Sequence, residues 1–171
     1  VGGGLDGDVN TMAVFNNELV AAGNFTLAGG TVSVSNIAKW NGSAWMNLGS
    51  GLNGQVFAVV VFNNELYAGG SFTTAGGNPA LNIAKWNGSS WQPVGAGFNT
   101  FVRTLTVHNN RLIAGGFFTL SGATTANRIA EWKGSSWPAM GGGFNNKVYS
   151  MNSNNGKRET RGEVNNIGRV N

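Results

Sequence analysis

One feature restricts the fold of this chain more than any other: a stretch of 46 or 47 residues recurs along it. The segment VGGGLDGDV, which starts at Val1, returns as LGSGLNGQV, VGAGFNTFV and MGGGFNNKV, starting at Leu48, Val94 and Met140. In register with these, FNNELV, FNNELY and HNNRLI recur, and so do NIAKWNGSAW, NIAKWNGSSW and RIAEWKGSSW. Self-similarity at a fixed period of this length is typical of propellers and other repeat arrays.

The matches divide the chain into three complete repeats and one incomplete, divergent repeat. Their ranges are 1–47, 48–93, 94–139 and 140–171. Together they form a single propeller-like domain or a fragment of a larger ring.

Each complete repeat is predicted to contain four short strands. The run VFAVVVF (56–62) is apolar on both faces, which indicates a strand buried between packed sheets. The pair NN makes a tight turn into ELYAGG, and NIAKW and WQPVG follow as a second hairpin around NGS. If Asn41 and Gly42 form the centre of a type I′ turn, Trp40 pairs with Ser43 and Ala38 with Trp45. The two indoles then lie diagonally on one face of the hairpin.

Four antiparallel strands in 46 residues make one blade of a β-propeller. The segments IAKWNGSSWQPVGAG, NNELYAGGSFT and TTAGG resemble the kelch-like propeller repeats of large secreted and cell-surface proteins, mostly bacterial. This resemblance extends from Val1 to about Asn155. It implies a propeller in an extracellular or cell-surface setting, and it implies no particular reaction. We therefore predict an all-β fold, a β-propeller-type array of four-stranded antiparallel blades with about 3.7 repeats.

The closing segment GKRETRGEVNNIGRVN aligns with the third repeat without a gap, so that Gly162 corresponds to Gly116. Charged residues replace apolar ones there: Arg158 stands where Leu112 is expected, and Glu159 where Ile113 is expected. Three explanations remain open. The segment is a capping or edge unit whose charges oppose edge-to-edge pairing, a frayed unit whose remaining strands are missing, or an inaccurately determined stretch of sequence.

Both ends of the chain offer the first two strands of a repeat, so complementary halves cannot close a ring. We expect either a fragment of a larger ring or an assembly of several chains, with a small four-bladed ring as the alternative. The expected partners are other copies of the chain or the rest of a longer chain, and glycans are a further option. The chain starts at Val1 without a visible signal peptide, as in a mature or excised protein.

Composition excludes several classes of function. The formal net charge is +4, from 11 Lys and Arg against 7 Asp and Glu, and the cations are not clustered enough for nucleic-acid binding. No apolar run approaches the length of a membrane span. There is no cysteine, which excludes disulfides, thiolate metal sites and a cysteine nucleophile.

The sequence contains few residues that could take part in catalysis. His108 is the only histidine and occupies the turn-entry position of Phe15 and Phe62, so neither a catalytic triad nor a His-rich metal site can be assembled. A copper oxidase of the galactose-oxidase type is excluded for the same reason. We predict no enzyme, no cofactor and no catalytic residue. Asp6 and Asp8 are the only calcium candidates, and a turn is the favoured interpretation because other repeats carry Asn or Gln there.

Two sets of residues are candidates for contact with carbohydrate, either as a bound ligand or as an attached glycan. The paired tryptophans, which are favoured as core residues, could instead stack on sugar rings; they are Trp40, Trp45, Trp86, Trp91, Trp132 and Trp137. The sequons at Asn24, Asn41 and Asn87 would accept glycans in a eukaryotic secretory pathway, although two of them coincide with Asn-Gly turns.

These observations predict a non-catalytic extracellular module that serves structure, adhesion or filament formation through protein–protein contacts. The alternative is a lectin-like, carbohydrate-binding propeller.

Overall fold

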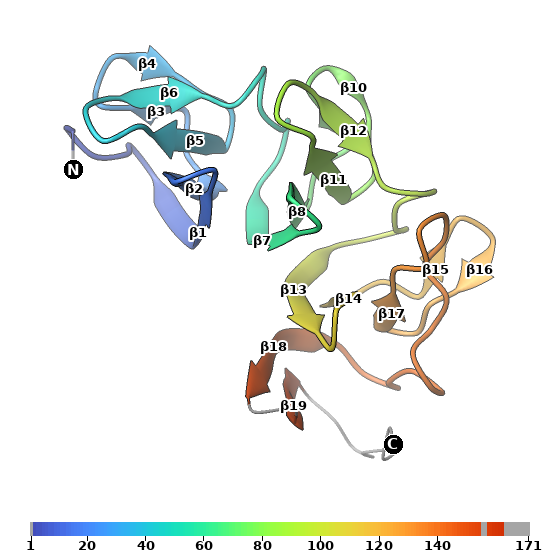
Figure 1. The fold of residues 1–171 in the computed structure, drawn as a ribbon. Helices are drawn as coiled ribbons and strands as arrows, with labels where there is room; N and C mark the ends of the chain where they lie inside the picture. Colours follow the sequence, from blue (N-terminus) through green and yellow to red (C-terminus); the bar gives the residue numbers. More distant parts are fainter. Residues whose placement is uncertain (1, 155–156, 163–171) are drawn as a thin grey trace.

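The computed structural model describes residues 2–154 and 157–162, with side-chain environments for residues 2–152. All regular structure in these residues is β-structure in antiparallel sheets (Figure 1). The all-β prediction is therefore confirmed, whereas the described residues form no closed propeller. Within the same residues, no helix is long and apolar enough to cross a membrane.

The first two repeats form four-stranded sheets of identical topology. Sheet 1 has the order β1-β2-β5-β6, with strands Asp8–Phe15, Glu18–Asn24, Ile37–Trp40 and Trp45–Asn47. Sheet 2 has the order β7-β8-β11-β12, with strands Val56–Phe62, Glu65–Gly70, Ile83–Trp86 and Trp91–Pro93. The Gly- and Thr-rich connections contain small two-stranded hairpins that the sequence did not predict. These are β3 (Leu27–Ala28) with β4 (Val32–Ser33), β9 (Thr74–Ala75) with β10 (Asn78–Pro79), and β15 (Leu120–Ser121) with β16 (Thr124–Thr125).

Sheet 3 contains three strands, β13 (Val102–His108), β14 (Arg111–Gly116) and β17 (Ile129–Glu131). Its fourth strand is reduced to an isolated bridge between Ala130 and Ala139. The reason is Pro138, which occupies the position where Gln92 pairs with Lys85 in sheet 2. Proline has no N–H to donate, so the ladder cannot continue through it.

Sheet 4 is the hairpin of β18 (Val148–Asn154) and β19 (Lys157–Gly162). Its backbone pairs Val148 with Gly162, as β13 and β14 pair Val102 with Gly116. The charged replacements predicted at Arg158 and Glu159 lie outside the residues whose side chains are described. The remainder of the closing segment, 163–171, lies outside the described residues.

The Asn-Asn turns are confirmed. In each of the first three sheets, both central Asn residues have positive φ, as a type I′ turn requires, and the flanking residues pair directly. The prediction for the second hairpin is wrong: Trp40 pairs with Trp45 and not with Ser43. The loop has four residues because Asn41 Oδ1 accepts hydrogen bonds from the backbone N–H groups of Ser43 and Ala44, each at 2.9 Å.

The sheets pack face to face in sequence order. The first strands β1, β7, β13 and β18 lie side by side along the inner side of an arc, and the later strands lie outside it (Figure 1). On β7, Val56, Val59 and Val61 pack on sheet 1, whereas Ala58 and Val60 pack toward sheet 3. A strand covered on both faces is what the continuous apolar run predicted.

Small residues on the second strand of each sheet make this close packing possible. A Cβ at Gly69 of β8 would lie 2.5 Å from Val102 Cγ1 of the next sheet, and one at Gly115 would lie 2.9 Å from Val148 Cγ1. Ala22 holds the equivalent place in sheet 1 and is fully buried. The valine of each following sheet therefore fits against a residue with almost no side chain.

Candidate functional site

The first strand of every sheet carries a β-bulge at the same repeat position. The pairing shifts between Val9 and Thr11 in β1 and between Val56 and Ala58 in β7. The same shift separates Val102 from Thr104 and Val148 from Ser150. Each bulge leaves one extra residue without a partner in the ladder; these residues are Asn10, Phe57, Arg103 and Tyr149. Bulges re-aim side chains and are common next to binding sites.

The backbone is crowded at the bulges of the first three sheets. The residue opposite it on the second strand is Gly23, Gly70, Gly116 or Gly162. A Cβ at Gly70 would lie 2.2 Å from the carbonyl oxygen of Gln55, too close for any other residue without rearrangement. The four sheets thus have the same β-bulge at the same repeat position, and each carries a different side chain there.

The four bulged residues line one shared cavity of about 330 Å³. We call this surface, made by Asn10, Phe57, Arg103 and Tyr149, the bulge face. The hydroxyl-bearing residues Thr11, Thr104 and Ser150 also line the cavity, and no acidic side chain does so among the described residues. Its volume lies within the usual range for small-molecule sites.

Aromatic rings extend from the cavity along one side. Phe57, Phe101, Phe117 and Tyr149 form this aromatic row, with successive ring centroids 6.2, 6.1 and 5.2 Å apart. Phe101 and Tyr149 are each 41% exposed. Two cations lie over the row: Arg103 Cζ is 4.0 Å from the centroid of Phe57, and Lys147 Nζ is 5.0 Å from that of Phe117.

Arg103 carries a buried polar atom, its Nε, that lacks a hydrogen-bond partner among the described residues. None of the ion pairs found in this part of the chain includes Arg103. Buried polar atoms are normally hydrogen-bonded, so an unpartnered guanidinium nitrogen beside a cavity is a departure that calls for a physical reason.

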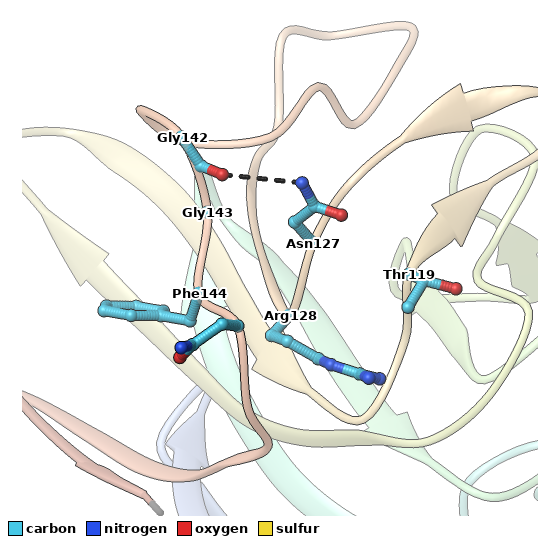
Figure 2. Close-up of a pocket in the computed structure, with 7 residues that line it drawn as sticks. Thr119, Asn127, Arg128, Gly142, Gly143 and Phe144 are labelled. Atoms are coloured by element: carbon cyan, nitrogen blue, oxygen red, sulfur yellow. Dashed lines mark hydrogen bonds between the residues drawn. The ribbon is translucent and has the colours of Figure 1, made fainter. Parts of the chain in front are cut away.

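A second cavity, of about 390 Å³, lies where repeat 3 departs from the pattern of the others (Figure 2). In repeats 1 and 2, the side-chain amides of Asn36 and Asn82 donate to the carbonyl oxygens of Leu52 and Phe98. Arg128 stands at the equivalent position, in a left-handed conformation with φ of 70°.

Arg128 does not repeat the asparagine contact. Its side chain extends toward Thr119 in Figure 2 and donates to the carbonyl oxygen of Phe117. Asn127 instead donates to the carbonyl oxygen of Gly142, at 3.4 Å. The second cavity thus lies where repeat 3 replaces the amide bridge of the first two repeats with a different one, from Asn127 to Gly142.

The calcium candidates Asp6 and Asp8 are not part of a cluster of acidic or histidine ligands in the described residues. The carboxylate of Asp6 accepts three hydrogen bonds, from Thr26 N–H, Thr26 Oγ1 and Leu27 N–H, each at 2.8 Å. The N–H of Leu27 is the largest cause that lowers the pKa of Asp6, followed by the Thr26 hydroxyl. Asp8 is exposed, and no group of three potential ligands is found in this part of the molecule.

The two tryptophans of each complete repeat contact each other, and in sheets 1 and 2 they are directly paired across the hairpin and not diagonal as predicted. Ring centroids are 5.6 Å apart for Trp40 and Trp45, 5.6 Å for Trp86 and Trp91, and 5.0 Å for Trp132 and Trp137. The indole N–H of Trp91 donates to Leu48 O at 2.8 Å, and that of Trp137 donates to Val94 O at 3.2 Å. The second tryptophan of each pair is buried, which favours packing over carbohydrate contact for these rings.

The remaining candidates lie apart from the bulge face. Asn24, Asn41 and Asn87 are exposed, and the latter two also organise their hairpin loops through Oδ1. His108 is half-buried at the end of β13, where it pairs with Arg111 across the turn. Glycosylation at the three sequons stays a prediction.

Sequence reasoning missed the bulge face altogether. The available signal was a position that varies among Asn, Phe, Arg and Tyr, while the preceding residue is always valine. No family model matches the sequence, and a search of curated proteins finds no significant match. The kelch-like resemblance therefore stays a prediction.

Proposed function

We propose that this chain is a non-catalytic, propeller-type repeat module of the extracellular space or cell surface that works through protein–protein contacts. The observation that carries the proposal is an uncovered apolar face on sheet 1. We call it the free face, and it consists of Val9, Met12 and Val14 on β1. These side chains are 43, 62 and 67% exposed.

The same positions are contact positions in the other sheets. Val56 and Val59, which correspond to Val9 and Met12, are 0 and 8% exposed because they pack against sheet 1. Val102 and Leu105 are likewise buried against sheet 2. The free face therefore has the composition of a surface that this fold covers with another sheet.

We assign the covering sheet to a second copy of the chain, with the two free faces packed against each other. A head-to-tail arrangement through β19 is less suitable, because β19 has Arg161 where β2, β8 and β14 have Ala22, Gly69 and Gly115. Placing a charged residue between packed sheets costs several kcal/mol unless it is paired, on the order of the penalty for a buried ion. A two-fold contact uses the same patch on both copies.

Cysteine cross-linking tests this assignment directly, because the chain has no cysteine of its own. The Met12→Cys variant should form a disulfide-linked dimer under mild oxidation, and Leu81→Cys, at an exposed apolar residue elsewhere, should not. In the cysteine-free chain, Met12→Lys with Val14→Lys should abolish a concentration-dependent increase in particle mass, measured by light scattering. At a concentration where the wild type is a single copy, the two chains should have the same melting temperature. A wild-type chain that keeps the mass of one copy at all concentrations would contradict the proposal.

Carbohydrate binding is the second candidate function. The bulge face favours it, because exposed aromatic rings lie beside a cavity lined by hydroxyl groups. Binding to an array of neutral and acidic glycans tests it. A flat response across the array would remove this candidate and leave the assembly proposal unaffected.

A further inference from the structure

We propose that the bulge face binds a small ring-bearing carboxylate, with the Arg103 guanidinium receiving the carboxylate and the aromatic row receiving the ring. This site is separate from the free face, and the inference does not depend on assembly.

The charge of the cavity selects an anion. Arg103 is the only charged residue that lines it among the described residues, and no carboxylate of those residues pairs with it. Of the three guanidinium nitrogens, only Nε is both buried and without a hydrogen-bond partner among the described residues. A guanidinium presents paired N–H groups in a fork that fits a carboxylate.

A single guanidinium favours a carboxylate over a phosphate. Phosphate sites usually combine several cations or a set of converging backbone N–H groups, as at helix N-termini or nests. The described residues contain no helix, and Lys147 lies over Phe117 and does not line the cavity. One singly charged group is therefore the best electrostatic match.

The aromatic neighbours select a ring. Phe57 holds the guanidinium over its own ring at 4.0 Å, which fixes the cation at the edge of the aromatic row. A ligand whose carboxylate meets Arg103 can therefore place its body against Tyr149, which is the other aromatic residue of the row that lines the cavity. Planar aromatic rings and the apolar faces of sugar rings both suit such a surface.

Two ligand types share this chemistry, aromatic carboxylates and uronic acids. The hydroxyl groups of Thr11 and Ser150 are equally suited to a phenol or to sugar hydroxyls. The experiment therefore uses 4-hydroxybenzoate and glucuronate as probes, with 4-hydroxybenzyl alcohol and glucose as their uncharged counterparts and inorganic phosphate as an anion without a ring.

Titration of the full chain, followed by calorimetry and by the ¹⁵N–¹H signal of Arg103 Nε, should show saturable binding of at least one carboxylate. Its uncharged counterpart should bind at least tenfold more weakly, about 1.4 kcal/mol. The Arg103→Gln variant should also lose at least tenfold in affinity. The matched control Arg111→Gln removes an exposed guanidinium from another strand and should bind like the wild type.

Phe57→Leu keeps the arginine but removes the ring beneath it, and it should weaken binding by several-fold. This second variant and the Nε signal of the wild type keep the test valid if Arg103→Gln does not fold. Several results would overturn the proposal: no saturation by either carboxylate, equal binding of the uncharged counterparts, equal binding of phosphate, or wild-type affinity in both Arg103→Gln and Phe57→Leu.

Discussion

The side chains of Asp6, Asn53 and Asn99 make equivalent hydrogen bonds in the first three repeats, although the first is a carboxylate and the other two are amides. Each accepts two backbone N–H groups from the start of the connection after the second strand, at 2.8 to 3.1 Å. The acceptor is a carboxylate oxygen in the first repeat and an amide oxygen in the other two. Only the first of these clamps depends on pH.

The pKa of Asp6 is lowered by the donors that surround its carboxylate, so folding favours the ionised form. A lowered folded-state pKa contributes stability that is complete above the unfolded-state value, near 3.8, and is lost as pH falls through the folded value. We expect the unfolding midpoint of Asp6→Asn to match the wild type above pH 5 and to fall less steeply below pH 4, as measured by urea denaturation across pH.

Asn53→Asp is the matched converse, because it introduces a carboxylate into an equivalent clamp. This variant should become more sensitive to acid than the wild type. Parallel pH profiles for all three proteins would show that the clamp carboxylate has no linkage to folding.

An ion pair between the second and third strands occurs in all three sheets, but in sheet 3 the acidic and basic residues have exchanged strands. Lys39 pairs with Glu18 at 2.7 Å in sheet 1, and Lys85 pairs with Glu65 at 3.0 Å in sheet 2. In sheet 3 the acid and base exchange strands: Arg111 of β14 faces Glu131 of β17 at 3.7 Å. Lys133 also reaches Glu131, at 2.7 Å, which matters because Glu131 is buried.

This exchange predicts coupling between the two strands. Glu131→Lys alone places a buried cation beside two others and should destabilise the chain, whereas adding Arg111→Glu should restore part of the loss. We expect a coupling of about 0.5–1 kcal/mol between the two changes. A double-mutant cycle by urea denaturation, with Glu18→Lys and Lys39→Glu as the reference cycle in sheet 1, measures it, and purely additive effects would contradict the prediction.

The elements differ in how far sequence could predict them. The Asn-Asn turns were predictable, because few residues other than asparagine and glycine adopt two consecutive positive φ angles. The Trp40–Trp45 register was not, since it depends on three-dimensional hydrogen bonds to Asn41 Oδ1 that lengthen the loop. The loss of the fourth strand of sheet 3 was predictable from Pro138, because proline has no N–H to donate to the ladder.

The candidate site was harder to predict than the strands. A β-bulge has no fixed residue type in this chain, since Asn10, Phe57, Arg103 and Tyr149 share no chemistry. The cavity forms only when four strands, about 46 residues apart, lie side by side. The residues that the sequence singled out, the tryptophans and the closely spaced aspartates, therefore turned out to be packing residues and, for Asp6, a loop clamp.

The whole molecule is a series of sheets in which each first strand contacts the first strand of the next. β1 lies against β7, β7 against β13, and β13 against β18. In such an array, stability is the sum of each sheet's own stability and the contacts between neighbours. The interface between sheets 2 and 3 is therefore the place where a single change should separate the molecule into two parts.

Gly69 provides that change, because a side chain there meets Val102 and Leu105 of sheet 3. Gly69→Val should cost about 1–3 kcal/mol, the usual range for overpacking a closely packed interface. Hydrogen exchange measured by mass spectrometry should show lost protection in β8 and β13, while β2 and β5 keep theirs. Gly142→Ala, where an added Cβ meets no atom within 4 Å, is the control and should exchange like the wild type. A uniform loss of protection in all sheets would contradict the prediction, since it would mean that the sheets unfold as one cooperative unit.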